Sequence, residues 1–151
     1  MRSKKITKWI PIVPYGIIGG MIPSASTLMF KRKRGEEHFS IWLSDLQSRI
    51  AVEQSLNKEK PFHFVQKILE ATKNIPKRCY FLERQDERDI VMISFSGDLK
   101  NMKFYADEVI SFCILNRCQF FCTKEFFTKP SRELPQRFKN HLPSERPALL
   151  N

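Results

Sequence analysis

The chain has 151 residues, 42% of them hydrophobic, which is enough to bury the core of a single domain. Its formal net charge is +10 and its isoelectric point is about 9.7. This charge predicts a polyanionic partner, with nucleic acid favoured over an anionic membrane surface, although a basic solvated surface without a partner would have the same composition. The sequence has no repeat of solenoid period and no glycine-rich phosphate loop, which argues against repeat architectures and P-loop nucleotide sites.

The cysteines are too few and too unevenly spaced for a disulfide scaffold: Cys79, Cys113, Cys118 and Cys122. The last two lie in the stretch CQFFC, which is predicted as a strand. On a strand, positions four apart lie about 13 Å from each other, whereas each ligand of a zinc ion lies about 2.3 Å from the metal. We therefore expect buried, reduced thiols in a cytoplasmic protein.

The first 26 residues combine a basic start, an apolar stretch and small residues near Ala25, which is similar to a secretory signal. The stretch is broken, however, by prolines and glycines: Pro11, Pro14, Gly16, Gly19, Gly20 and Pro23. It is also too short to span a bilayer. We predict an N-terminal strand followed by a glycine turn, with no stable membrane insertion, and keep the secretory signal as the alternative.

Residues 26–30 and 38–43 are apolar-rich and are predicted as the two strands of a hairpin that turns near Gly35. The open end of this hairpin would carry four consecutive cations: Lys31, Arg32, Lys33 and Arg34. Ser44 and Gln47 then match the S-x-x-Q capping box, which predicts that a helix begins here.

A second helix is predicted to begin at Pro61 and to end before Pro76. Three strand-like runs follow at residues 77–83, 89–97 and 102–106. The connectors between them have turn composition, so an antiparallel meander is the simplest arrangement.

The third helix is predicted to begin at Asp107, and residues 118–127 are predicted to return as a strand. Residues 129–151 hold four prolines, many charges and no sustained periodicity, so we expect a basic, Pro-rich and disordered tail. The folded domain would then cover residues 1–128. This order of elements predicts an α+β fold with about three helices and a mainly antiparallel sheet.

Two adjacent acids, Asp107 and Glu108, precede the nearly continuous apolar run VISFCIL. Acids in a first helical turn satisfy free N–H groups and complement the helix dipole, for about 0.5 to 2 kcal/mol. Carboxylates also hold the divalent metal that phosphodiester hydrolysis usually employs, here Mg²⁺ or Mn²⁺. Adjacent helical side chains diverge by about 100°, so the pair would share a metal only if Asp107 lies at the cap. Both interpretations, cap and catalytic or metal site, stay open.

Two further residues are candidate partners of the acidic pair. His63 precedes the second predicted helix and could act as a general base near neutral pH, although a surface or capping histidine is the simpler interpretation. Asp45 heads the first predicted helix and would join the pair if the fold brings the starts of the helices together.

Basic side chains form the candidate nucleic-acid contacts. The cations at Lys31 to Arg34, together with Lys124 and the basic termini, could neutralise phosphates without selecting a base sequence. Exposed aromatic rings that stack on bases would strengthen this interpretation. Most phenylalanines alternate into predicted strands, and Trp42 lies within an apolar strand, so we expect these rings in the core.

Three stretches of the chain resemble, in order and spacing, the bifunctional nuclease (BFN) domain, a bacterial and plant family assigned both DNase and RNase activity. The stretch SIWLSDLQSRIAVEQSL is similar to the family's PIWIG strand and the helix after it, and KPFHFVQKILEAT stands where the family has RPLTHDLL and a helix. The stretch KFYADEVISFCILNRCQFFCTKEFF looks like DARPSDAIALALRLGAPIFVAEEVL without a gap. The resemblance covers roughly residues 12–127 and implies a curved, mainly antiparallel sheet and a homodimer.

Several polar positions of the family motifs are changed in this chain. Tyr105 stands at the position of the motif's arginine, Asp107 at its serine and Glu108 at its aspartate. His63 stands at a threonine position and Val65 at an acidic one. The chain therefore resembles a divergent member of the family.

The resemblance implies a nuclease that hydrolyses phosphodiester bonds in DNA or RNA, with Mg²⁺ or Mn²⁺ on the acidic pair if a metal is used. Its catalytic residues would be Asp107, Glu108, His63 and Asp45, with Tyr105 beside the nucleic acid. The alternative is a nucleic-acid-binding or regulatory domain that keeps the fold without the catalysis, and a protein-interaction module is a third class.

Overall fold

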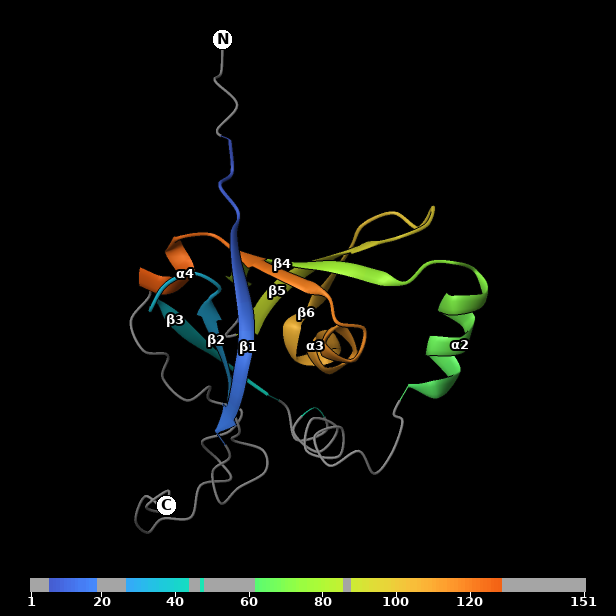
Figure 1. Ribbon diagram of the computed structural model, residues 1–151, viewed down its shortest axis with the longest axis horizontal. Coiled ribbons are helices and arrows are strands. Elements are labelled where there is room, and N and C mark those ends of the chain that lie inside the picture. The colour runs from blue at the N-terminus through green and yellow to red at the C-terminus, as the bar shows by residue number, and fades with distance from the viewer. Residues whose placement is uncertain (1–5, 19–26, 44–46, 48–61, 86–87, 129–151) are drawn as a thin grey trace.

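The computed structural model describes residues 6–18, 27–43, 47, 62–85 and 88–128. They form one curled sheet of seven strands, in the order β3-β2-β1-β7-β4-β5-β6, with three helices described in full (Figure 1). The predicted α+β class with a mainly antiparallel sheet is confirmed. The elements are β1 (Ile10–Ile18), β2 (Thr27–Arg32), β3 (His38–Trp42), α2 (His63–Ala71), β4 (Pro76–Gln85), β5 (Arg88–Phe95), β6 (Met102–Tyr105), α3 (Ala106–Leu115), β7 (Gln119–Cys122) and α4 (Glu125–Thr128).

The sheet consists of two antiparallel units joined by its two central strands. On one side β1, β2 and β3 form a meander, and on the other β4, β5 and β6 form a second one. β1 pairs with β7 antiparallel, and β7 pairs with β4 in the parallel direction. The predicted N-terminal strand, the hairpin around Gly35 and the meander before the third helix are therefore confirmed.

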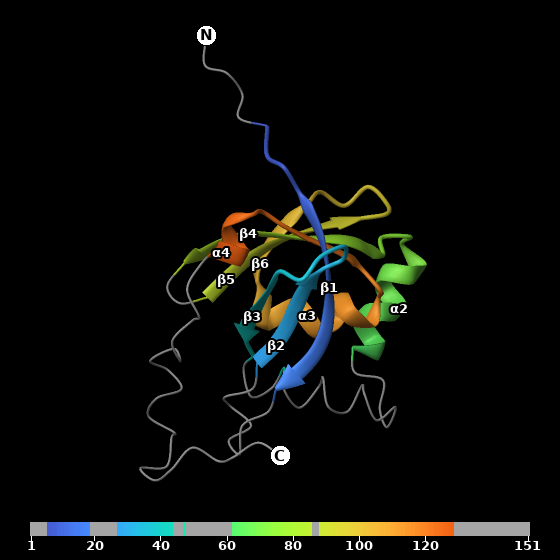
Figure 2. The same ribbon diagram turned by 60° about the vertical axis from the view of Figure 1, so that its left-hand side comes forward.

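Helix α3 makes the connection that closes the curl. The chain leaves the sheet at the edge strand β6, passes along β5 and β4 as α3, and re-enters the sheet centre as β7. Figures 1 and 2 show α3 held within the curved sheet, while α2 stands at its side. The apolar residues that α3 buries are Ala106, Ile110 and Cys113, and it also buries the polar residues Asp107 and Ser111.

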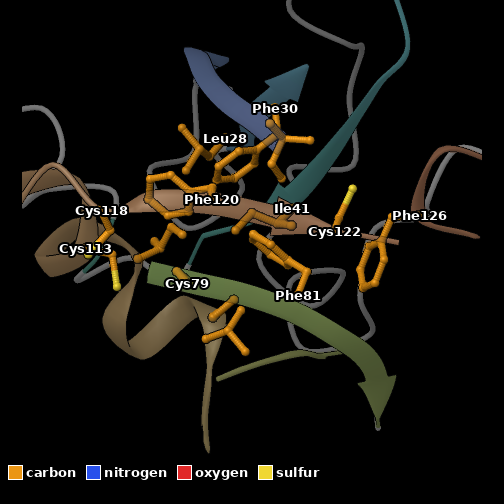
Figure 3. Close-up of a cluster of buried hydrophobic side chains, with 14 of the residues drawn as sticks. Leu28, Phe30, Ile41, Cys79, Phe81, Cys113, Cys118, Phe120, Cys122 and Phe126 are labelled. Carbon is orange, nitrogen blue, oxygen red and sulfur yellow. The ribbon is translucent and has the colours of Figure 1, made fainter. Parts of the chain in front are cut away.

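A cluster of phenylalanine rings fills the space inside the curl. Phe30 on β2 lies 5.2 Å from Phe81 on β4 and 5.3 Å from Phe120 on β7, measured between ring centroids. Phe39 on β3 also contacts Phe81, at 5.4 Å. Figure 3 shows Phe30, Phe81 and Phe120 converging from three strands of the sheet. Because aromatic pairs at this distance gain energy beyond the area they bury, the cluster holds the two wings together.

The predicted strand at residues 118–127 is wrong in its second half, because β7 ends at Cys122 and α4 takes the place of its continuation. The N–H groups of Phe126 and Phe127 bond to the carbonyl groups of Thr123 and Lys124, which forms a helical turn. This turn brings Phe126 into the core, 5.4 Å from Phe39 and 5.7 Å from Phe81. Packing of one aromatic ring thus overrides the β-propensity of the segment.

The second predicted helix is confirmed as α2, but its apolar side chains are not buried. Phe64 is 77% exposed, Val65 45% and Ile68 48%. At its start Phe62 adopts a left-handed conformation and packs on Phe112 of α3 at 5.3 Å. Between α2, α3 and the edge strands lies a groove of about 310 Å³ with mostly apolar walls.

Several aromatic residues, among them Trp42, which was predicted for the core, belong to the other face of the sheet. Along β4, Cys79 and Phe81 are fully buried, whereas the alternating residue Tyr80 is partly exposed. Phe121, the register partner of Tyr80 on β7, is also partly exposed, and so is Trp42 at the end of β3. The prediction that Trp42 lies in the core is therefore wrong, and Phe121 is a phenylalanine that faces away from the core.

Some predicted features lie outside the described residues: Ser44, Asp45, Pro61 and the tail at 129–151. Gln47 is described and is helical. Among the helices that the structure describes, none is long and apolar enough to cross a membrane.

All four cysteines of the chain are free and buried, as predicted. Burial raises the pKa of the Cys122 thiol from its ordinary value of 9.0 to about 12, with Glu37 adding to the shift and Arg32 opposing it. A hydrogen bond to Cys113, followed by burial, raises the pKa of Cys118 as well. Thiolate, the reactive form, is therefore disfavoured in the folded protein.

We expect the folded protein to react very slowly with a thiol reagent such as DTNB at pH 8, where a thiol of pKa 12 is ionised to about one part in ten thousand. In denaturant all four thiols should react at the ordinary rate. Since the folded state favours the neutral thiol, stability should also fall as the pH rises from about 9 to 12. Rapid modification of one thiol in the native protein would contradict this burial.

Candidate functional site

The acidic pair is joined by an arginine that the sequence analysis did not select. Arg88, the first residue of β5, donates from Nε and Nη2 to Oδ1 of Asp107, at 3.1 and 2.7 Å. Its Nη2 also lies 3.6 Å from Oε1 of Glu108. The guanidinium carbon lies 3.7 Å from the ring centroid of Tyr105, which is a cation–π arrangement. Four residues from β5, β6 and α3 thus form one compact group.

Strand register explains why Arg88 reaches this position. Ile90 on β5 pairs with Tyr105 on β6, so Arg88 points to the same face two residues beyond the end of that ladder. The chain turns into α3 directly after Tyr105, which places Asp107 opposite Arg88. In sequence, Arg88 is the last residue of the predicted connector RQDER, and only the pairing of β5 with β6 identifies it.

Burial makes the Arg88–Asp107 contact the strongest ion pair of the group. The side chain of Asp107 is 5% exposed and that of Arg88 27%, so water screens their attraction only in part. By contrast, the pair formed by Arg32 and Glu37 at the hairpin turn is 37% and 43% exposed. Charge on Asp107 is therefore held by a fixed guanidinium in the first turn of α3.

Glu108 performs the capping role that the sequence analysis left open. The helix has Tyr105 as its N-cap, and Oε2 of Glu108, the third helical residue, accepts a hydrogen bond from the Tyr105 N–H at 3.3 Å. Its side chain is nevertheless 52% exposed. Glu108 is therefore both a cap and a solvent-accessible carboxylate beside Arg88.

Gln47 fixes the same helical turn from the side. Its Nε2 donates to the carbonyl oxygen of Glu108 at 3.2 Å, and its Oε1 accepts from the N–H of Ser111 at 3.3 Å. The side chain predicted to close a capping box of its own helix thus bonds to α3. Since Gln47 is buried, these bonds order the first turn of α3.

Asp107 and Glu108 are the two predicted metal ligands, and their carboxylates differ in how accessible they are to an ion. Oδ1 of Asp107 already accepts two bonds from Arg88, whereas Glu108 presents a half-exposed carboxylate. In the described part of the chain, no three His, Cys, Asp or Glu side chains gather closely enough to hold a metal ion. Glu108 is therefore the better candidate ligand of the pair.

The other predicted catalytic residues are not brought to the acidic pair. His63 is exposed at the start of α2, and no contact recorded among the described residues joins it to Asp107 or Glu108. Asp45 lies outside the described residues. The role of both stays a prediction.

The predicted nucleic-acid contacts occupy the hairpin turn and the end of β7. Lys31 and Arg32 end β2, and Lys33 and Arg34 form the turn, where Arg32 is paired with Glu37. A cavity of about 460 Å³ adjoins this turn and is lined by Arg32, Lys33 and Arg34 together with parts of β1 and β7. Lys124 lies beyond β7 and lines a second hollow of about 460 Å³.

Comparisons with known proteins add no relatives to this description. No protein-family model matches the chain, and no curated protein matches it. Membership of the bifunctional nuclease family, homodimer formation and a cytoplasmic location therefore stay predictions.

Removing Arg88 should destabilise the domain, because it takes the cationic partner away from a carboxylate that is 5% exposed. We expect Arg88→Gln to lower the free energy of unfolding by about 2 to 3 kcal/mol. A double-mutant cycle with Asp107→Asn, measured by urea unfolding, should give a coupling energy of about 1 to 3 kcal/mol.

The exposed pair at the hairpin supplies the matched control. Arg32→Gln removes a guanidinium whose partner Glu37 is 43% exposed, so it should cost no more than about 1 kcal/mol. Equal costs for Arg88→Gln and Arg32→Gln would contradict the assignment of Arg88–Asp107 as the dominant ion pair.

Proposed function

We propose that the protein is a nuclease that hydrolyses phosphodiester bonds in DNA or RNA, with Arg88 and Glu108 as the residues that meet the scissile phosphate. The carrying observation is the guanidinium of Arg88, which lies on the ring of Tyr105 and beside both acids. In the family that the sequence resembles, the motif's arginine stands at the position of Tyr105. The chain thus has a cation close to that position, although a different strand supplies it.

The group offers the charges that phosphodiester hydrolysis needs. Arg88 uses Nε and Nη2 for Asp107, and no contact among the described residues uses its Nη1, which is suited to donating to a phosphate oxygen. Asp107 acts as the positioning residue that orients this guanidinium. The exposed carboxylate of Glu108 can accept the proton of an attacking water. The ring of Tyr105 holds the guanidinium of Arg88 in place through the cation–π contact.

If the reaction uses a divalent ion such as Mg²⁺, Glu108 would be its carboxylate ligand instead of the proton acceptor. Magnesium is usually held by one or two carboxylates together with substrate phosphates and water, so a site with one accessible carboxylate is sufficient. When bound, the ion would stabilise negative charge on the phosphate.

The second candidate function is nucleic-acid binding without catalysis. It is favoured by a specific observation: both described bonds of the Arg88 guanidinium go to Oδ1 of Asp107, so the buried acid is engaged in an ion pair. A group built only for stability would look the same at this carboxylate. The two candidates differ in what Glu108 does, which a single substitution tests.

We expect Glu108→Gln to lower the cleavage rate of labelled single-stranded DNA or RNA by at least about a hundredfold. Glutamine is accepted at the third position of a capping box, so the substitution removes the charge while keeping the cap and the melting temperature. The assay compares Mg²⁺, Mn²⁺ and EDTA on single- and double-stranded DNA and RNA.

Glu70→Gln is the matched control, since Glu70 is an exposed acid on α2, away from Arg88. It should cleave at the wild-type rate. A wild-type protein that binds nucleic acid but does not cleave any of the four substrates would reject the nuclease and leave the binding domain. Cleavage that survives Glu108→Gln would reject this residue as the reacting group.

A further inference from the structure

We propose that the outer face of the sheet, opposite α3, binds single-stranded nucleic acid, with one unstacked base entering the cavity beside the hairpin turn. The surface is defined by the aromatic residues Trp9, Tyr80 and Phe121 and by the cavities at the two ends of this row. It is distinct from the acidic group, and it deepens the proposed function because it names a single strand as the form that is bound.

The three rings form a continuous row across the sheet. Phe121 stacks on Tyr80 with 5.1 Å between ring centroids and 19° between ring planes, and Tyr80 lies 4.9 Å from Trp9. All three are partly exposed, although neighbouring residues on the same strands are buried. Helices α3 and α4 bury side chains on the opposite face: Ala106, Ile110, Cys113 and Phe126. The row is therefore an aromatic surface on the face of the sheet that lies away from α3 and α4.

The first cavity lies where β1 leaves β7. β1 and β7 pair only from Ile10 to Ile12, after which β1 pairs with β2 alone. Pro14 stands just beyond this point and lacks the N–H that a ladder needs. The opening has a volume of about 460 Å³, within the usual range of roughly 300 to 1,000 Å³ for ligand sites.

The lining of this cavity suits a nucleotide with its phosphate. Phe121 and the proline Pro11 offer apolar surface, Gln119 offers an amide for a base edge, and Lys33 and Arg34 offer cations. The side chains of these two cations make no ion pair with any residue that the structure describes. A base would thus contact the end of the aromatic row while its phosphates reach the turn.

The second hollow lies at the other end of the row and is also lined by apolar side chains and cations. Trp9 and Leu82 provide its apolar wall, and Lys8 and Lys124 provide cations, against one acid, Glu125. Between the two ends the strands add Arg78 and Lys103, both exposed. Register pairs connect them on one face: Pro11 with Phe121, Phe121 with Tyr80, Tyr80 with Met92 and Met92 with Lys103.

The positive charge of this face favours nucleic acid as its ligand over the apolar surface of a partner protein. The chain carries a net charge of +10, and cations outnumber acids along this face. Stacking on exposed rings requires bases that are free of a duplex, since paired bases are already stacked within it. The combination of rings and cations therefore selects a single strand.

The binding test uses anisotropy of a short fluorescein-labelled single-stranded oligonucleotide in EDTA, so that it is independent of cleavage. We expect Lys33→Gln/Arg34→Gln to weaken binding at least about tenfold and to reduce the salt slope by about 1.4, that is about 0.7 for each of two lost phosphate contacts. Phe121→Leu, which keeps an apolar side chain of similar size, should weaken binding about tenfold at unchanged salt slope.

Lys67→Gln/Lys100→Gln is the matched control, because it removes two exposed cations from α2 and from the loop before β6. It should leave the affinity within about twofold. An equal loss in this control, or a preference for the duplex of the same sequence, would overturn the proposal. If AMP competes with the same affinity as the oligonucleotide, the single strand is rejected as the ligand, and the cavity is a site for a free nucleotide.

The two proposals fail in separable ways. The Lys33→Gln/Arg34→Gln variant should lose strand binding in EDTA while it keeps the wild-type melting temperature and the Arg88–Asp107 ion pair. Cleavage without strand preference would reject only the outer face, and strand binding without cleavage would reject only the nuclease.

Discussion

The phenylalanine rings of both wings of the sheet must share one interior, and this constraint shapes the molecule. Phe30 and Phe39 come from one meander, Phe81 from the other and Phe120 from the strand that joins them. Their mutual contacts require the sheet to curl, and the curl receives α3 and the ring of Phe126. Once one face is committed to this interior, the alternating residues must face outward. The aromatic row on the outer face is the consequence of the same strand periodicity.

The acidic group depends on that arrangement as well. The curl carries the edge strand β6 into α3 at the place where β5 begins, and so Arg88 meets the first turn of the helix. Asp107 and Gln47 then hold this turn through buried polar bonds, which leaves Glu108 as its accessible carboxylate. Adjacent residues of one helix therefore differ in role: Asp107 forms a stabilising ion pair, and Glu108 has a carboxylate that is accessible for catalysis. The two possible roles that the sequence allowed for these acids are divided between the structural pair and Glu108.

Periodicity and turn composition were sufficient to predict the hairpin, the meander, α2 and α3. Prediction failed where a contact between residues far apart in the sequence determines the local structure. Phe126 packs on Phe39 and Phe81 in the core, so α4 forms in place of a strand. It failed also for Trp42, because alternation shows that a strand has two faces without showing which one is the core. Arg88 could not be selected, since its neighbours in space follow from the register of β5 on β6. Asp45 and the tail lie outside the described residues, and their predictions stand as made.

The central claim is that the outer face of the sheet, and not the apolar groove beside α2, meets nucleic acid. Amide chemical-shift mapping with a short single-stranded oligonucleotide in EDTA tests it directly. The account predicts shifts at Lys33, Gln119, Phe121 and Tyr80, extending toward Lys103 at the edge strand. Shifts confined to Val65, Leu69 and Phe112 in the groove, or no shifts at all, would contradict it.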